Sequence, residues 1–225
     1  MAIFWNTHAR ITPEVAQAHI TDLLSISPPI TLPTPFEAVD LTPKPKPKPT
    51  DASADTDTPS GRPPLDTPDE HALRALLLGI THRAAGHPTD ARRFLLDAHA
   101  RHARIPSTGS TWIGGVALFE LAVLELREAQ RAEREGASGG SGTGSEGSSE
   151  EEGYGGRELR LRVDALALSG SARARWMKVL KDAAALLDSA MSLSGAEVDL
   201  SSRLESRIAM LRDEIALKRE MLGGS

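Results

Sequence analysis

A pattern of small and large side chains occurs twice in this 225-residue sequence and limits its fold more than any other feature. The two copies are Asp90-Ala91-x3-Leu95-x2-Ala98 and Asp182-Ala183-x3-Leu187-x2-Ala190. In a helix these positions share one face, where the small residues let a neighbouring helix approach and the leucine fills the space between them. The repeat therefore predicts helices that pack in pairs.

Each copy has an upstream partner segment with a small residue where the two helices would cross. Gly79 lies twelve positions before Ala91, and Ala122 lies sixty-one positions before Ala183. The difference of forty-nine (61 − 12) indicates an insertion in the second pair, which costs little because loop-closure entropy grows only logarithmically. The first spacing resembles that of the tetratricopeptide repeat, although generic helix packing would also produce it, since Ala and Leu are common. We expect an all-α fold of tetratricopeptide-like antiparallel hairpins with a C-terminal capping helix.

Two biased stretches divide the chain, because proline is concentrated between Pro28 and Pro68 and glycine between Gly136 and Gly156. Neither stretch carries enough apolar surface to offset the entropy of ordering. The expected segments are an N-terminal helical hairpin (1–27), a disordered Pro-rich linker (28–68), a hairpin plus helix A of the second repeat (69–135), a disordered Gly/Ser/Glu insertion (136–171), and helix B with the capping helix (172–222). The Lys-Pro run at 44–49 is either an extended spacer or an SH3-type ligand.

Residue preferences at helix ends predict where several helices begin. Thr12 and Asp69 are expected N-caps, and Thr89 or Asp90 is expected to restart a helix after Gly86. The stripe expected in the N-terminal helix is Val15, His19, Leu23 and Ile26. The stripe expected in the last helix is Leu200, Leu204, Ile208, Leu211, Ile215 and Leu222, with Arg203, Glu205, Arg212, Glu214 and Lys218 at the other positions.

The repeat register also predicts a protein-binding groove on the A helices. Its expected lining is Leu76, Ile80, Phe119 and Val123. All four are apolar, so the groove would take an amphipathic helix rather than a terminal carboxylate, which Lys, Arg and Asn would hold. The alternative is that the chain's own terminal helix or N-terminal hairpin fills the groove, because the ends of helical arrays need capping.

The sequence shows no arrangement typical of an enzyme, a cofactor site or a metal site. It has no cysteine, and His99 and His102, with His82 and His87 nearby, lack further converging ligands. The net charge of −5 gives no reason to expect a nucleic-acid partner, and no apolar run reaches the ~20 residues of a transmembrane helix. Ser148 and Ser149 precede three glutamates, so they are either phosphorylation sites or part of an unmodified solvating tract.

Three segments resemble the C-terminal part of the tetratricopeptide repeat protein 39 family, which includes the fungal inclusion-body clearance proteins, also labelled mitochondrial outer-membrane proteins. They are Leu73 to Gly79, Ala117 to Ala122 and Ser202 to Ile208. The resemblance implies a non-catalytic scaffold that binds protein partners, among them lipid-droplet proteins, in inclusion-body clearance or lipid-droplet-linked proteostasis. It implies a cytoplasmic location, with the nucleus or the periphery of the mitochondrial outer membrane as further sites.

A peripheral adaptor at the mitochondrial outer-membrane surface is the alternative function. The basic residues of the linker are its main support. The three lysines between Lys44 and Lys48 fall short of the four to eight cations typical of a lipid-binding cluster. Protein binding is therefore the preferred interpretation.

Overall fold

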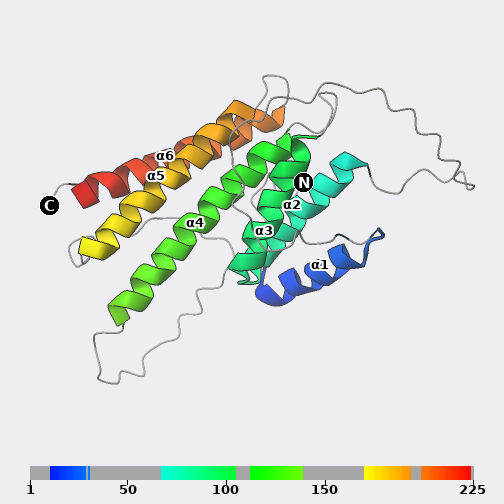
Figure 1. Ribbon diagram of the computed structural model, residues 1–225, viewed down its shortest axis with the longest axis horizontal. Coiled ribbons are helices and arrows are strands. Elements are labelled where there is room, and N and C mark those ends of the chain that lie inside the picture. Colours follow the sequence, from blue (N-terminus) through cyan, green and yellow to red (C-terminus); the bar gives the residue numbers. More distant parts are fainter. Residues whose placement is uncertain are drawn as a thin grey trace, which may run out of the picture.

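The computed structural model describes residues 11–28, 30, 67–104, 112–138, 170–193 and 199–223, and in these it contains six α-helices and no strand (Figure 1). The predicted all-α class is confirmed over this part of the chain. The helix expected before residue 11, the Lys-Pro run and both serines of the glutamate-rich tract lie outside the described residues.

The first helix, α1 (Pro13–Ser25), begins where the sequence predicts. The Thr12 hydroxyl accepts a hydrogen bond from the Val15 amide at 3.4 Å, which confirms Thr12 as the N-cap. The predicted stripe is wrong in part: Val15, His19 and Ile26 are exposed, whereas Leu23 packs against the cluster that contains Ile20. The buried positions of α1 are Ala16 and Ile20, one residue after Val15 and His19.

Two kinds of contact attach α1 to the next helix, α2 (Pro68–Ala84). Ile20 packs with Leu78 of α2 and with Phe94, which belongs to the third helix, in a small apolar cluster. The buried Arg74 side chain donates hydrogen bonds to the carbonyl oxygens of Ile26 (3.0 Å) and Pro28 (2.5 Å). These carbonyls follow the end of α1, so the guanidinium satisfies acceptors that the helix leaves unpaired.

A capping box starts α2. The Thr67 amide donates to Glu70 Oε2 at 2.6 Å, and the Glu70 amide donates to Thr67 Oγ1 at 3.3 Å. The prediction of Asp69 as the cap is therefore wrong, and Asp69 lies within the first turn. Thr67 is the N-cap because it lies three residues before Glu70, and this spacing lets each side chain reach the backbone amide of the other residue.

A tight turn at Gly86, whose φ is 81°, joins α2 to α3 (Pro88–His102). This left-handed conformation favours glycine. The helix begins earlier than predicted, because Pro88 occupies the first turn with its φ preset for a helix, and Thr89 and Asp90 are already helical. His87 stands at the N-cap without a capping side-chain hydrogen bond.

The hairpin of α2 and α3 is packed through the residues of the first repeat. Ala91, Leu95 and Ala98 of α3 are all buried, and Gly79 of α2 lies directly beneath Leu95. A Cβ built on Gly79 would be 2.7 Å from Leu95 Cγ and 3.1 Å from the Leu95 amide nitrogen. The absence of a side chain at Gly79 is therefore what allows the two helices to approach this closely.

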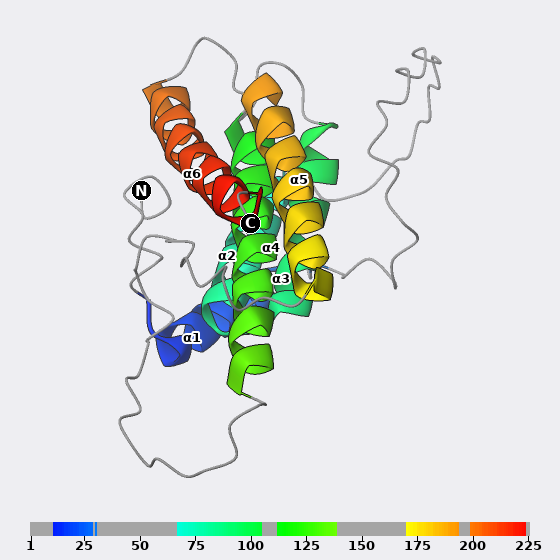
Figure 2. The ribbon, with the colours of Figure 1, turned by 90° about the vertical axis from the view of Figure 1, so that its left-hand side faces the viewer.

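Two long helices, α4 (Trp112–Ser138) and α5 (Gly170–Leu193), form the second pair. They extend three and two residues into the range 136–171, where the sequence predicts an insertion. Ala122 of α4 is buried, and so is each α5 residue of the second repeat, namely Ala183, Leu187 and Ala190. The two helices run in opposite directions side by side (Figures 1 and 2).

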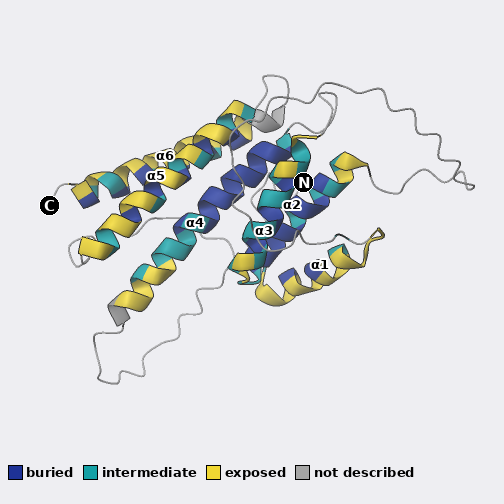
Figure 3. Ribbon diagram, in the orientation of Figure 1, coloured by how far each residue is buried: buried dark blue, intermediate teal, exposed yellow. Residues whose placement is uncertain are grey.

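The last helix, α6 (Asp199–Gly223), packs against α4 and α5. Neighbouring helices in the chain contact each other in order, and α4 also contacts both α2 and α6 (Figure 2). One apolar core runs continuously from α2 to α6, and the first half of α4 is its most deeply buried segment (Figure 3). The candidate functional site lies where α4 contacts both α2 and α6.

Candidate functional site

The four residues of the predicted groove lie close to one another in the structure, and all are buried. Leu76 and Ile80 belong to α2, and Phe119 and Val123 belong to α4; none is more than 7% exposed. They form part of the core that α2, α4 and α6 share. A side-chain change at any of them would disturb packing inside the protein before it affected a surface.

Helix α6 covers α4 at the groove position Phe119. The guanidinium carbon of Arg207 lies 4.3 Å from the centre of the Phe119 ring. This distance is within the range of a cation–π interaction. Arg207 Nη2 also donates a hydrogen bond to Glu120 Oε1 at 3.1 Å. The face of α4 that the sequence assigns to a partner helix is thus in contact with a helix of the same chain.

Glu120 is fully buried and shared by cations from two other helices. Arg83 of α2, which is 6% exposed, donates from Nη2 to Glu120 Oε2 at 2.6 Å. Arg207 of α6 takes the other carboxylate oxygen. Charge-assisted hydrogen bonds of this kind are short and directional. One carboxylate of α4 therefore joins both α2 and α6 to this helix.

A second cation of α6 is held in the same manner three helical turns further along. Lys218 is fully buried, and its Nζ lies 4.7 Å from the centre of the Trp176 ring of α5. The same Nζ is 3.4 Å from both carboxylate oxygens of Glu133 on α4. The prediction that placed Lys218 away from the buried stripe is wrong, because the aromatic ring and the carboxylate together accept the cation.

Polar contacts also fix the orientation of α6 against α5. Arg212 pairs with Asp188 at 2.5 Å, and Arg219 donates to the Leu180 carbonyl oxygen at 3.0 Å. From Arg212 to Arg219 the residue numbers of α6 increase, while those of the partners on α5 decrease from Asp188 to Leu180. The two helices are therefore antiparallel. Arg207 pairs with Glu120 and Lys218 pairs with Glu133, so the residue numbers increase in the same direction on α6 and α4. Helix α6 therefore runs parallel to α4.

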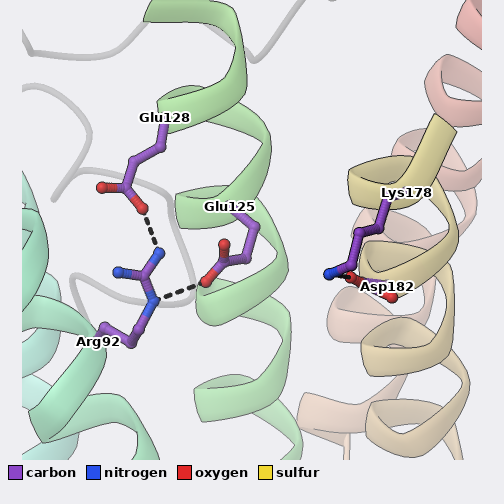
Figure 4. Close-up of polar contacts among 5 residues, drawn as sticks. All are labelled: Arg92, Glu125, Glu128, Lys178 and Asp182. Atoms are coloured by element: carbon purple, nitrogen blue, oxygen red, sulfur yellow. Dashed lines mark hydrogen bonds and ion pairs between the residues drawn. The ribbon is translucent and has the colours of Figure 1, made fainter. Parts of the chain in front are cut away.

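The contact between α3 and α4 is stabilised by Arg92, which reaches two glutamates of α4 (Figure 4). Arg92 Nε donates to Glu125 at 2.8 Å, and Nη2 pairs with Glu128. Burial tends to lower the pKa of Arg92, but the hydrogen bonds and charges of the two carboxylates raise it above its ordinary value. Figure 4 also shows the exposed pair of Lys178 and Asp182 within α5, which joins no two helices.

Four histidines lie at or near α3, of which His82 is buried and His87 is exposed. His82 stacks on Phe94, with ring centres 5.2 Å apart, and His87 lies 5.7 Å from His82. Burial lowers the pKa of His82, and it lowers the pKa of His99 with a further contribution from His102. No group of three or more potential ligands among the described residues is placed to hold a metal ion.

Sequence reasoning did not predict the contacts that attach α6, although one feature of the sequence indicates them. Lys218 has helical spacing from Leu211, Ile215 and Leu222 and so lies on the apolar stripe. A charge on such a stripe indicates a partner of opposite charge on the neighbouring helix. The partners themselves, Glu120 and Glu133, are eighty-seven and eighty-five positions away from Arg207 and Lys218.

Comparison with protein-family models, with curated proteins and with solved structures found no match to this chain. Among the described helices, none is long and apolar enough to cross a bilayer. The arguments about function that follow therefore rest on the geometry of the helices.

Proposed function

We propose that this chain is a non-catalytic protein-interaction scaffold that binds an amphipathic helix on the face of α4 and α5. The observation that carries the proposal is the position of Arg207 over Phe119 and against Glu120. It places α6 against Phe119, one of the four residues that the repeat register assigns to a groove on the A helices. Helix-in-groove binding uses apolar residues at helical spacing with polar contacts at the margins, and α6 has this composition.

The spacing of the first repeat supports a tetratricopeptide-like arrangement of the hairpins. The close approach of Gly79 to Leu95 also supports it, because such a repeat has a small residue where its two helices cross. The resemblance to the tetratricopeptide repeat protein 39 family supports a role in inclusion-body clearance or lipid-droplet-linked proteostasis, at a cytoplasmic location. The polypeptide partner would then be a protein of that process.

The test compares capture of partners from cell extract by the wild-type chain, Arg207→Glu and Arg203→Glu. Arg207→Glu places an acid against Glu120 and should release α6, so that α4 and α5 become accessible. Arg203→Glu makes the same charge change at an exposed position of α6 and is the matched control. We expect specific proteins to be enriched on Arg207→Glu alone, with cross-links that map to α4 and α5. Equal recovery on all three chains would contradict the proposal.

A further inference from the structure

Two cations of α6, the partly buried Arg207 and the fully buried Lys218, occupy sites of the same composition. Arg207 lies over an aromatic ring and beside a glutamate, Phe119 and Glu120. Lys218 does the same with Trp176 and Glu133. We call these pairs the first and the second cation site. All four residues that form the sites belong to α4 and α5, and Glu120 of the first site is also paired with Arg83 of α2.

The spacing of the cations matches one face of a helix. Arg207 and Lys218 are eleven residues apart, which is about three turns at 3.6 residues per turn. Between them Ile208, Leu211 and Ile215 are buried against α4 and α5. The face therefore accepts a helix with a cation at position 1, apolar residues at positions 2, 5 and 9, and a second cation at position 12.

A buried cation is a costly way to attach a helix. Lys218 loses its hydration, and its 3.4 Å separation from Glu133 is long for a charge-assisted hydrogen bond. Apolar side chains in place of both Lys218 and Glu133 would avoid that cost, whereas replacing Lys218 alone leaves the largely buried Glu133 carboxylate without this cation. The pair of Lys218 and Glu133 therefore contributes more to the choice of partner helix and its register than to stability.

The position of α6 in the array makes exchange feasible. In the described residues α6 packs mainly against α4 and α5, whereas α2 and α3 pack mainly against each other and against α4. The carboxylate of Glu120, which Arg83 and Arg207 share, links α2 to α6. A partner helix with the same two cations would find the same aromatic rings and carboxylates. Charge complementarity is thus the basis for identifying the partner.

We propose that the face of α4 and α5 selects a partner's amphipathic helix by two cations eleven residues apart, and that α6 is the resident helix that such a partner displaces. This inference rests on the proposed function and specifies its partner. The resident helix competes at the high effective concentration of a tethered segment. A partner therefore binds detectably when α6 is weakened or when the partner presents both cations.

The test uses a fluorescent peptide of residues 199–223 and the full chain, either wild-type or with Arg207→Met and Lys218→Met together. Methionine fills the space of each stem but removes the charge, so the resident helix no longer occupies the cation sites. We expect the peptide to bind the substituted chain at least about ten-fold more tightly than the wild-type chain, which corresponds to one decade in Kd.

Two control peptides test whether the cation sites are responsible. One carries Arg207→Met, and the other carries Arg203→Met at an exposed position. Each loses one positive charge, but only the second keeps both cations that fit the sites. We expect the second to bind the substituted chain like the unmodified peptide and the first to bind at least about ten-fold more weakly.

Hydrogen exchange on the substituted chain separates the remaining outcomes. Equal binding of both control peptides would overturn the inference. So would an α6 that stays fully protected in the substituted chain without any peptide binding, because the cations would then contribute nothing to its attachment. If the double substitution reduces the helix content of α2 to α5, the same peptides are tested on Arg207→Met alone. If the peptides behave as expected but no protein from cell extract is enriched on Arg207→Glu, the result would instead contradict the proposed function.

Discussion

Gly79 and Leu95 are in contact across the hairpin of α2 and α3, with no room for a methyl group between them. A Cβ on Gly79 would lie 2.7 Å from both Leu95 Cγ and Leu95 Cδ2. The leucine side chain cannot move away freely, because Leu95 is almost completely buried. Because glycine has only a hydrogen atom in place of a side chain, the two helices can approach each other closely at Gly79.

The first prediction is that Gly79→Ala destabilises the chain. Alanine gains about 1 kcal/mol of helix propensity over glycine, but overpacking a core costs about 1–3 kcal/mol. We expect a net loss of about 1 kcal/mol in the free energy of unfolding, measured by urea denaturation. The matched control is Gly136→Ala in α4, where a Cβ would meet no atom within 4 Å. That change should be neutral or stabilising, and a stabilising effect of Gly79→Ala would contradict the observed packing.

The second prediction concerns the buried carboxylate of Glu120. Glu120→Gln keeps the shape of the side chain but removes the negative charge that Arg83 and Arg207 share. Breaking a buried ion pair in this way costs about 3–5 kcal/mol. We expect a loss of this size in chemical denaturation. Glu135→Gln, in the exposed pair with Arg131 on the same helix, should change stability by no more than about 0.5 kcal/mol.

A double-mutant cycle extends the test of Glu120. Adding Arg207→Met to Glu120→Gln removes one of the two cations that pair with the Glu120 carboxylate in the wild-type chain. We expect the double substitution to cost less than the sum of the two single ones, because residues in one ionic network couple. Strictly additive effects would show that Arg207 and Glu120 do not interact in solution.

The third prediction is a loss of stability on mild acidification. The pKa of His82 is lowered in the folded chain, first by burial and then by His87, and Asp90 opposes this only in part. The unfolded chain therefore binds protons more readily, so stability is complete above the ordinary histidine pKa of ~6.5 and falls as the pH decreases below it. His99 acts in the same direction, with burial as the first cause and the charge of His102 as the second.

Thermal unfolding between about pH 7.5 and pH 5.5 measures this effect in the range where histidine titrates. We expect Tm to fall over this range in the wild-type chain. His82→Phe keeps a ring against Phe94 and removes the titrating group, so its Tm should fall less steeply. A variant whose pH profile is the same as that of the wild-type chain would show that His82 does not take part.

The fourth prediction compares the two ion-pair arrangements in Figure 4. Arg92 joins α3 to α4 through a fork that two glutamates of α4 accept, and lysine cannot reproduce this geometry. Arg92→Lys should destabilise by about 1 kcal/mol, as expected for a partly exposed charge-assisted pair. Lys178→Ala removes an exposed pair within one helix and should cost no more than about 0.5 kcal/mol. Thermal melts at low and high salt measure both.

The sequence was sufficient for the helices and for the first hairpin because their signals are local. Thr12 before Pro13, and the repeat spacing from Gly79 to Ala98, depend on residues within one or two elements. Helix starts were less secure where two capping residues compete, as with Thr67 and Asp69, since the glutamate three positions further along decides between them. The face of α1 was displaced for a similar reason, because the buried positions depend on what α2 presents to it.

The attachment of α6 depended on the tertiary structure alone. Amphipathic spacing in the sequence determines that α6 is a helix and that it buries Leu204, Ile208 and Leu211. It does not determine which side chain faces a lysine or an arginine. Glu120 reaches both Arg83 and Arg207, thirty-seven and eighty-seven positions away, only because α2, α4 and α6 meet in space. Local chemistry thus determined the elements, whereas the pairing of charges was decided by packing, because electrostatic partners are chosen by distance and burial and not by position in the chain.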